Sequence, residues 1–312
     1  MNLKRPTIEA LSWLPNSAPK VALYRKLGAN IGKRVRMGKG SFIWSPNFHE
    51  VTIGDGVTIR DNTRFFCKKL TIQEDSYVER DCFVSGSEFL LGFGSYFGQR
   101  MFVDCTEPVQ IGQEVIISYT NIYTHEMNYT WVTEGRVKRK SGPVTIGHRA
   151  SLAPGIHIGA NVNIGDHSII GSGSIVLKDI SSYTLAAGVP CREIRSIREQ
   201  FESKQELLDD VKKYVEEYVA TKRDKSNVKF LFDESITTSN IKENFERHYI
   251  LIGNSVDDEV FYKLRVSSEE SISAFDVRRQ LYHKNENNLT HELKHGMRRF
   301  GLVFKPYKQS IR

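Results

Sequence analysis

Long apolar stretches are missing from the 312 residues of this chain. A helix that crosses a bilayer needs about 20 consecutive apolar residues, so we expect no membrane-spanning segment. The N-terminal residues also lack the apolar core and small-residue cleavage site of a secretory signal. Cysteines are few, and the four of them lie far apart without a CxxC pair: Cys67, Cys82, Cys105 and Cys191. We therefore expect reduced thiols in a cytoplasmic protein, with neither disulfides nor a zinc site.

The remaining composition is ordinary, with 39% hydrophobic and 26% charged residues, which excludes a disordered chain. The net charge of +7 is concentrated at the front, where residues 1–40 hold nine Lys and Arg against one acid, Glu9. Such a basic segment suits an anionic membrane surface, an acidic glycan or a nucleic acid, and a solvated helix face explains it equally well. No nucleic-acid-binding motif accompanies it, so we expect no nucleic-acid partner.

A six-residue repeat is the strongest signal in the sequence. Aliphatic residues fall six positions apart at Ile146, Leu152, Ile158, Ile164, Ile170 and Val176. Neither the 3.6-residue period of a helix nor the two-residue period of a strand gives this spacing. A unit with one inward aliphatic residue, a small corner residue and a turn forms one face of a triangular coil. Such coils stack as parallel strands about 4.8 Å apart.

The same pattern continues upstream with small irregularities. The aliphatic positions recur at nearly equal steps at Ile53, Ile72, Leu91 and Ile111. Each step is slightly longer than three repeat units and therefore corresponds to one coil. Residues 31–40 predict the first coil. The step from Ile111 to Ile146 is almost twice as long, because it holds one coil plus a polar and aromatic excess at 124–143. Binding function concentrates on long excursions from a rigid scaffold, so we expect the chemistry there.

These repeats resemble the hexapeptide-repeat acyltransferases, in particular galactoside and maltose acetyltransferases and capsular polysaccharide O-acetyltransferases. The resemblance covers residues 31–195 and implies an all-β fold, a left-handed parallel β-helix whose handedness comes from the resemblance alone. Residues 1–30 should form an N-terminal helical cap, with a helix that starts at Ser17 and ends at Gly28. This segment is similar to the helix that caps the coils in polysaccharide O-acetyltransferases.

Residues 196–312 predict a C-terminal α+β extension of unknown role. Apolar residues from Ile197 to Tyr218 keep helical spacing, and residues 229–233, 249–253 and 259–266 have strand character. A last helix is expected from Thr290 to Gly301. No motif in this region indicates chemistry.

His125 stands at the start of the excursion and is followed by Glu126. Imidazole suits the removal of a proton from an alcohol or amine near neutral pH, and it needs a partner on its second ring nitrogen. Glu126 or a backbone carbonyl would serve as that partner. The segment YTHE (123–126) resembles the one that carries the catalytic histidine of the galactoside and maltose enzymes, which implies the same role for His125.

The end of the repeat region resembles the acetyl-CoA site of the family. On that resemblance, the acetyl-CoA-binding residues are Ala153 in LAPGI, Lys178 in IVLKDI, and Ala187, Pro190 and Arg192 in LAAGVPCREI. Without the resemblance, the same stretch is explained as a plain terminator of the coils with solvated charges.

Aromatic and basic side chains of the excursion form the candidate acceptor site. We select Tyr123, Tyr129, Trp131 and Arg136, because aromatic rings beside cations suit a sugar, although a solubilising charge run explains them equally well. His148, His157 and His167 occupy differing outward places in their repeats, so we expect no metal.

The sequence thus predicts an acetyl-CoA-dependent O-acetyltransferase. His125 would act as general base for direct attack by a hydroxyl of a sugar or of a cell-surface or capsular polysaccharide. The resemblance implies a homotrimer. Leu11, Trp13 and Leu14 leave peripheral contact with the inner membrane face open.

Three alternatives stay open. One is an N-acetyltransferase acting on an amino sugar, with the same base and co-substrate. Another is a serine acetyltransferase, which is disfavoured because its long helical N-terminal domain is absent. The last is a non-catalytic β-helix scaffold.

Overall fold

A computed structural model describes residues 5–126, 129–198, 211–217, 228–236, 248–256, 272–276, 281–282 and 305–306. The chain divides into two compact units, Met1–Gln200 and Phe201–Arg312, and each is described by itself. In the described residues, no helix is long and apolar enough to cross a membrane.

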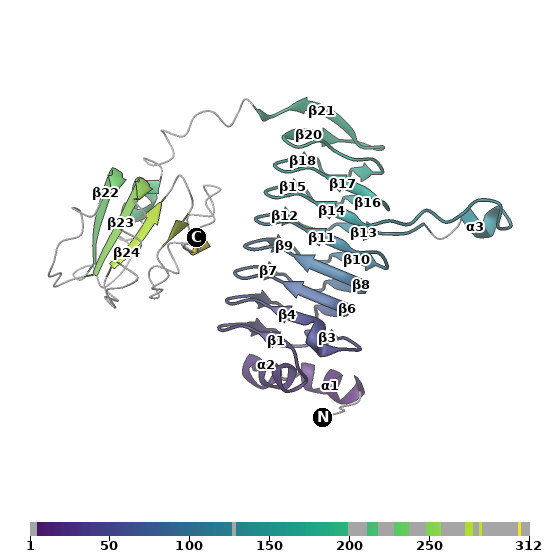
Figure 1. The fold of residues 1–312 in the computed structure, drawn as a ribbon, viewed down its shortest axis with the longest axis horizontal. Coiled ribbons are helices and arrows are strands. Elements are labelled where there is room, and N and C mark those ends of the chain that lie inside the picture. The colour runs from purple at the N-terminus through teal and green to yellow at the C-terminus, as the bar shows by residue number, and fades with distance from the viewer. Residues whose placement is uncertain are drawn as a thin grey trace, which may run out of the picture. The chain divides into compact units, whose positions relative to one another are not determined.

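Two helices cover the first coil (Figure 1). The predicted helix is α2 (Ser17–Lys26), and Gly28 follows it with a φ of +107° and donates its N–H to the Arg25 carbonyl at 3.1 Å. The helix α1 (Arg5–Ser12) was not predicted. Its Ile8 is buried against the coils, while the neighbouring Trp13 is 47% exposed. Together the helices cover the open sheet edge that a first coil would otherwise expose.

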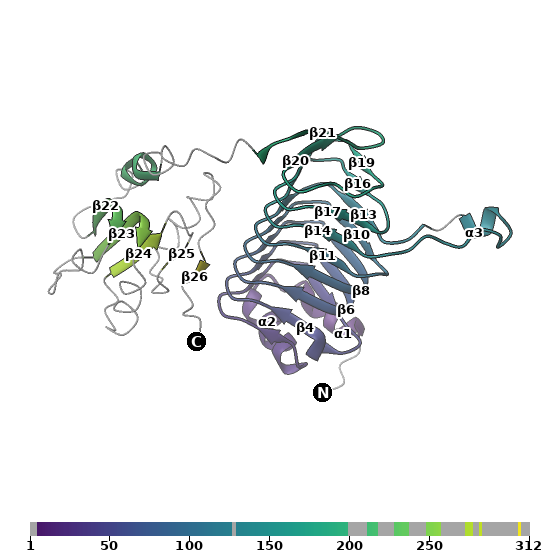
Figure 2. The same ribbon diagram turned by 45° about the horizontal axis from the view of Figure 1, so that its top comes forward.

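Stacked coils form a three-sided prism above this cap (Figures 1 and 2). One side is a nine-stranded sheet of β2 (Arg36–Met37), β5 (Thr58–Ile59), β7 (Tyr77–Val78), β9 (Tyr96–Phe97), β12 (Ile116–Ile117), β15 (Ser151–Leu152), β18 (Ile169–Ile170), β20 (Thr184–Ala187) and β21 (Arg192–Ser196). All neighbours in it are parallel except β21, which pairs antiparallel with β20 and closes the stack.

A twelve-stranded sheet supplies the other two sides, because β6 (Arg64–Ile72) and β8 (Phe83–Leu91) run across the corner between them. One of these sides adds β1 (Asn30–Ile31), β4 (Val51–Ile53), β11 (Val109–Ile111), β14 (Val144–Ile146) and β17 (Val162–Ile164). The other, here called the third face, adds β3 (Phe42–Trp44), β10 (Phe102–Cys105), β13 (Asn121–Tyr123), β16 (His157–Ile158) and β19 (Ile175–Val176). A short 3-10 turn, η1 (Phe48–Glu50), precedes β4.

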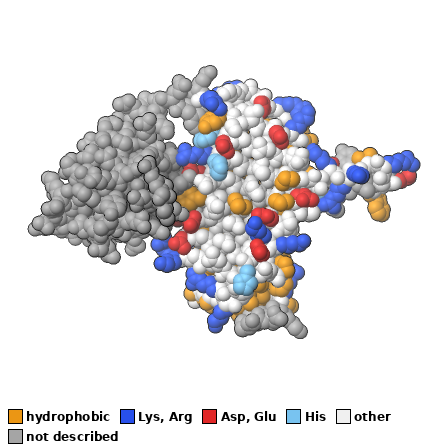
Figure 3. Space-filling view, in the orientation of Figure 1, with side chains coloured by type: hydrophobic (Ala, Val, Ile, Leu, Met, Phe, Trp, Pro, Cys, Tyr) orange, Lys and Arg blue, Asp and Glu red, His pale blue; other side chains and the backbone are white. Residues whose placement is uncertain are grey.

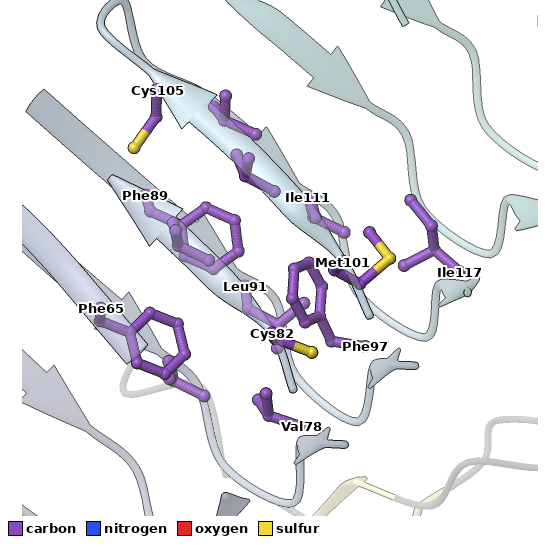
Figure 4. Close-up of a cluster of buried hydrophobic side chains, with 14 of the residues drawn as sticks. Phe65, Val78, Cys82, Phe89, Leu91, Phe97, Met101, Cys105, Ile111 and Ile117 are labelled. Atoms are coloured by element: carbon purple, nitrogen blue, oxygen red, sulfur yellow. The ribbon is translucent and has the colours of Figure 1, made fainter. Parts of the chain in front are cut away.

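The repeat residues fill the prism interior. All six aliphatic positions from Ile146 to Val176 are at most 2% exposed. Further down, Phe65, Phe89 and Phe97 pack against Leu91 and Ile111 (Figure 4). Each fully buried side chain of this size contributes roughly 1.5–3 kcal/mol. The predicted parallel β-helix of hexapeptide repeats is confirmed.

The second unit contains a five-stranded sheet and a helical stretch at 211–217. Its strands are β22 (Val228–Ile236), β23 (His248–Val256), β24 (Ile272–Asp276), β25 (Leu281–Tyr282) and β26 (Lys305–Pro306). The strands β22 and β23 coincide with the predicted strands at 229–233 and 249–253. The predicted strand at 259–266 and the predicted helix from Thr290 to Gly301 lie outside the described residues.

Candidate active site

The excursion leaves the prism at the third face, between Tyr123 at the end of β13 and Val144 at the start of β14. Its two ends run antiparallel: His125 faces Ser141, the Glu126 N–H donates to the Lys140 carbonyl at 2.9 Å, and the Gly142 N–H donates to the Thr124 carbonyl at 3.0 Å. Beyond this base the excursion projects as an arm that carries the short helix α3 (Tyr129–Val132) (Figures 1 and 2).

His125 is held at the base of the arm, with its side chain 9% exposed. Its Nδ1 atom lies 3.4 Å from Oδ2 of Asp104, in the coil below. This Nδ1 atom is buried, and it makes no hydrogen bond within the described part of the chain. A modest closing movement would turn this contact into a charge-assisted hydrogen bond, as catalytic contacts often do when substrate binds.

Asp104 is fixed from its other side. Its Oδ1 accepts hydrogen bonds from the Thr106 N–H at 3.0 Å and from the Thr106 hydroxyl at 2.7 Å, which leaves Oδ2 directed to the histidine. The Thr124 hydroxyl donates to the Asp104 carbonyl at 3.0 Å and accepts the Glu107 N–H at 3.0 Å. The buried Thr124 therefore ties the coil that carries Asp104 to the coil that carries His125.

Sequence reasoning did not find Asp104. The register pairs Asp104 with Tyr123, two residues before His125, so the carboxylate lies one coil upstream of the histidine. A search of the outward positions one coil before His125 would have indicated this residue. Glu126, the predicted partner, pairs across the base of the arm through its backbone, and the carboxylate beside Nδ1 is that of Asp104.

Lys178 lies on the corner that carries His125. The register aligns Ile122 with Ile158 and Ile158 with Val176. Two residues further along each strand direction, the same register stacks Thr124, Ala160 and Lys178. Two coil steps separate Thr124 from Lys178, about 10 Å at roughly 4.8 Å per coil. The exposed Lys178 thus stands on the C-terminal side of the histidine.

The other residues predicted to bind acetyl-CoA gather at the end of the nine-stranded sheet. Ala153, Gly171 and Ala187 form a column of small residues, and a Cβ added at Gly171 would lie 2.8 Å from the Ala187 Cβ. Arg192 pairs with Ala187 across the antiparallel closure, and the Val189–Pro190 peptide between them is cis. Small side chains leave the backbone open to an extended ligand there, and Arg192 adds exposed positive charge.

The predicted acceptor residues are divided between two places. Tyr123 is 39% exposed on the third face beside the histidine. Trp131 is 87% exposed on the arm, and Arg136 pairs there with Glu134 at 3.2 Å. The side chain of Tyr129 lies outside the described part. Figure 3 shows the arm as a narrow projection with basic and hydrophobic side chains. Among the predicted acceptor residues whose side chains the structure describes, Tyr123 is the one beside His125.

The four cysteines are free and buried. Burial raises the pKa of Cys191, so its thiol is protonated at neutral pH and is a poor nucleophile. In the described residues, no group of three or more His, Cys, Asp or Glu side chains is placed to hold a metal ion.

A comparison with protein-family models found no match to this chain, whereas comparisons with curated proteins and solved structures found relatives. The galactoside O-acetyltransferase of Escherichia coli strain K12 is 34% identical over 134 residues, which are 42% of this chain and 65% of that protein. The chain thus covers slightly less than two thirds of that relative.

Solved structures with similar coils include a hexapeptide-repeat acetyltransferase of Vibrio cholerae O1 biovar eltor in complex with acetyl-CoA. It has a TM-score of 0.36 and 18% identity, over 62% of this chain and 85% of that one. A maltose O-acetyltransferase from Clostridium difficile 630 has a TM-score of 0.33 and 20% identity, over 62% of this chain and 86% of that one. Together with the 34% identical relative, the coils of the structure confirm that this chain resembles the hexapeptide-repeat acetyltransferases.

Proposed function

We propose that this protein transfers an acetyl group from acetyl-CoA to a hydroxyl of a sugar or of a cell-surface polysaccharide, with His125 as the general base. The observation that carries the proposal is the His125 imidazole at the base of the arm, with a side chain only 9% exposed and the Asp104 carboxylate 3.4 Å from its buried Nδ1. A solvent-exposed bystander histidine would have neither the burial nor the oriented carboxylate.

In the proposed mechanism, each ring nitrogen of His125 has its own role. A proton on Nδ1 is directed to Asp104, which leaves the lone pair of Nε2 to accept the proton of the acceptor hydroxyl. The hydroxyl oxygen then forms a bond with the acetyl carbonyl carbon, and the bond between that carbon and the CoA sulfur breaks. The proton passes from Nε2 to the departing thiolate, so that the histidine is neutral again.

The residues at the C-terminal end of the prism fit acetyl-CoA, which supplies the activated thioester. The small-residue column of Ala153, Gly171 and Ala187 leaves backbone groups accessible to a pantetheine arm. Lys178 and Arg192 are exposed cations suited to phosphates. Lys178 stands two coils from the histidine corner on the same edge, which supports an extended donor directed toward His125.

Thermal unfolding of the full chain with and without acetyl-CoA tests the donor site. A ligand at 100 times its dissociation constant stabilises the folded state by about 2.7 kcal/mol, so we expect a clear rise in Tm. Lys178→Glu should abolish the rise. Lys39→Glu is the matched control, because it reverses an exposed lysine in the first coil, at the opposite end of the prism, and should keep the rise. No rise for the wild type at millimolar acetyl-CoA would overturn the proposal.

We also propose that the active assembly is a homotrimer, because the single chain leaves Trp131 exposed on an arm directed away from its own prism (Figures 1 and 2). A neighbouring subunit would bring such an arm to an active site. Light scattering on the purified protein should give three times the chain mass of 35.7 kDa. A mass of one chain at micromolar concentration would contradict this assembly.

A further inference from the structure

Aromatic rings form a continuous ladder along the third face. The ring centroids of Phe66 and Phe83 lie 5.5 Å apart, those of Phe83 and Phe102 lie 5.7 Å apart, and those of Phe102 and Tyr123 lie 5.7 Å apart. The central pair is stacked, with 13° between the ring planes. We call these four side chains the aromatic ladder.

Three rings of the ladder, those of Phe83, Phe102 and Tyr123, face solvent, whereas Phe66 is half-buried and packs against the core beside the buried Phe42. Phe83 and Phe102 are each 38% exposed and Tyr123 is 39% exposed. The residues that directly follow the two phenylalanines, Val84 and Val103, point inward and are fully buried. Inward valines already fill the interior at this level, so the rings are not needed to close it. Contiguous apolar surface that is exposed to solvent is a feature of interaction surfaces and ligand-binding grooves.

One end of the ladder is the candidate active site. Tyr123 is two residues before His125 and lies beside Asp104 in the register. At the other end, the guanidinium of Arg5 covers the Phe66 ring at 4.8 Å from its centroid, against the N-terminal cap. The ladder therefore runs from the histidine toward the N-terminal end of the prism.

The rings stop at the coil of His125. In the two coils above, the outward positions of the third face hold His157, Gly159, Ile175 and Leu177, without Phe, Tyr or Trp. The residues that suit acetyl-CoA, among them Lys178, lie on that C-terminal side. The donor surface and the ladder thus approach the histidine from opposite ends of the prism.

The chemistry of the surface fits sugar units. A pyranose ring has an apolar face of C–H groups that packs on aromatic rings, and hydroxyls at its rim that need polar partners. Outward polar side chains flank the ladder on the same strands: Arg64, Ser85, Asp104 and Asn121. A ligand of this kind requires apolar rings with polar side chains beside them, and this surface provides both.

We propose that the acceptor is a chain of sugar units that lies along the prism axis, with its reacting unit at His125 and its following units on the aromatic ladder. This inference rests on the proposed function. From the coil of Phe83 to the coil of Tyr123 the exposed rings cross two coil steps, about 10 Å at roughly 4.8 Å each. A single sugar would cover only a part of that length, so the surface selects oligosaccharides or polysaccharides.

Affinity electrophoresis of the full chain tests the ladder, with soluble amylose, dextran, xylan, hyaluronan and polysialic acid in separate gels. We expect at least one polymer to retain the wild-type protein. Binding of that polymer should be at least tenfold weaker for the Phe83→Ser/Phe102→Ser double variant. The control is Tyr77→Ser/Tyr96→Ser, which removes another stacked pair, 5.8 Å apart and at 15°, from the nine-stranded sheet and should leave retention unchanged. Phe102→Ser alone should give an intermediate loss and guards against a folding defect in the double variant.

The outcomes separate this inference from the proposed function. If the wild type shows the rise in Tm with acetyl-CoA but is retained by none of the polymers, the proposal of a glycan-binding ladder is overturned and the proposed acetyltransferase function stands. Equal losses in the ladder and control variants also overturn it. A ladder variant with a lower mass by light scattering would show that the rings bind a second copy of the chain, which likewise contradicts a glycan surface.

Discussion

At the scale of single residues, the site depends on a contact between two coils. His125 comes from the coil that the arm interrupts, and Asp104 comes from the coil below. The coil stacking, and not the local sequence, brings the carboxylate to the imidazole. Glu126 remains a predicted contributor, and the two acids are separable by mutation.

Asp104→Asn should lower kcat at least tenfold and leave KM for acetyl-CoA unchanged. The amide no longer offers Nδ1 a charged acceptor, while Thr106 still holds its carbonyl oxygen in place. Steady-state kinetics on an accepted sugar measures the effect, and Glu126→Gln serves as the matched variant with a smaller loss. A larger loss for Glu126→Gln than for Asp104→Asn would assign the orienting role to Glu126.

At the scale of structural elements, the corner below the site depends on one glycine. Gly86 has a φ of +146°, and a Cβ at this position would lie 2.1 Å from the carbonyl oxygen of Cys105, the neighbour of Asp104. Only a residue without a side chain lets the coil that carries Asp104 rest on the coil beneath it.

Gly86→Ala should therefore lower the free energy of unfolding by about 1–3 kcal/mol or more, because a backbone must move to relieve the clash. Gly135→Ala is the control: its φ is also positive, at +82°, but nothing lies within 4 Å of the added Cβ. Chemical denaturation measures both variants. Equal destabilisation would show that the backbone angle alone, and not the clash at Cys105, sets the effect.

The N-terminal cap is joined to the first coil by a buried tyrosine. The hydroxyl oxygen of Tyr24 in α2 accepts the N–H of Ile43 in β3 at 2.9 Å, and burial raises the pKa of Tyr24 to about 12. The folded state thus prefers the protonated phenol. Stability from this group is present below pH 10, the ordinary value, and is lost as the pH rises through about 12.

The wild type should lose roughly 2–3 kcal/mol of folding free energy across that window from this group, at about 1.4 kcal/mol per pKa unit. Tyr24→Phe should be about 1–3 kcal/mol less stable at pH 7, because the buried Ile43 N–H is left without a partner. It should also lose less stability between pH 10 and 12. Denaturation curves at both pH values test this, and parallel losses in the two proteins would assign the alkaline effect to other groups.

At the scale of the whole molecule, the sequence predicts most of the prism, because each six-residue unit contains the inward aliphatic residue and the turn that define one side of a coil. The inward aliphatic positions from Ile146 to Val176, the first coil at 31–40 and the arm between Tyr123 and Val144 all follow from spacing. Such repeats are local, so little long-range information is needed to place them.

Features that depend on contacts between coils are harder to predict from the sequence. Asp104 and the aromatic ladder arise from the register between neighbouring coils, whose paired residues lie a full coil apart along the chain. The helix α1 was missed because its apolar residues are few, and only contact with the coils buries Ile8. Peripheral membrane contact through Trp13 has no support beyond its partial exposure.

Acetyl transfer by His125→Ala tests the central claim most directly. Labelled acetyl-CoA is incubated with the full chain and with the five polysaccharides above, and the alkali-labile label on the polymer is counted, since an ester is cleaved by mild base and an amide is not. We predict that the variant keeps the acetyl-CoA rise in Tm but transfers at least about 100-fold less acetyl than the wild type. Transfer by His125→Ala within a few-fold of the wild-type rate would contradict the role of this histidine as general base.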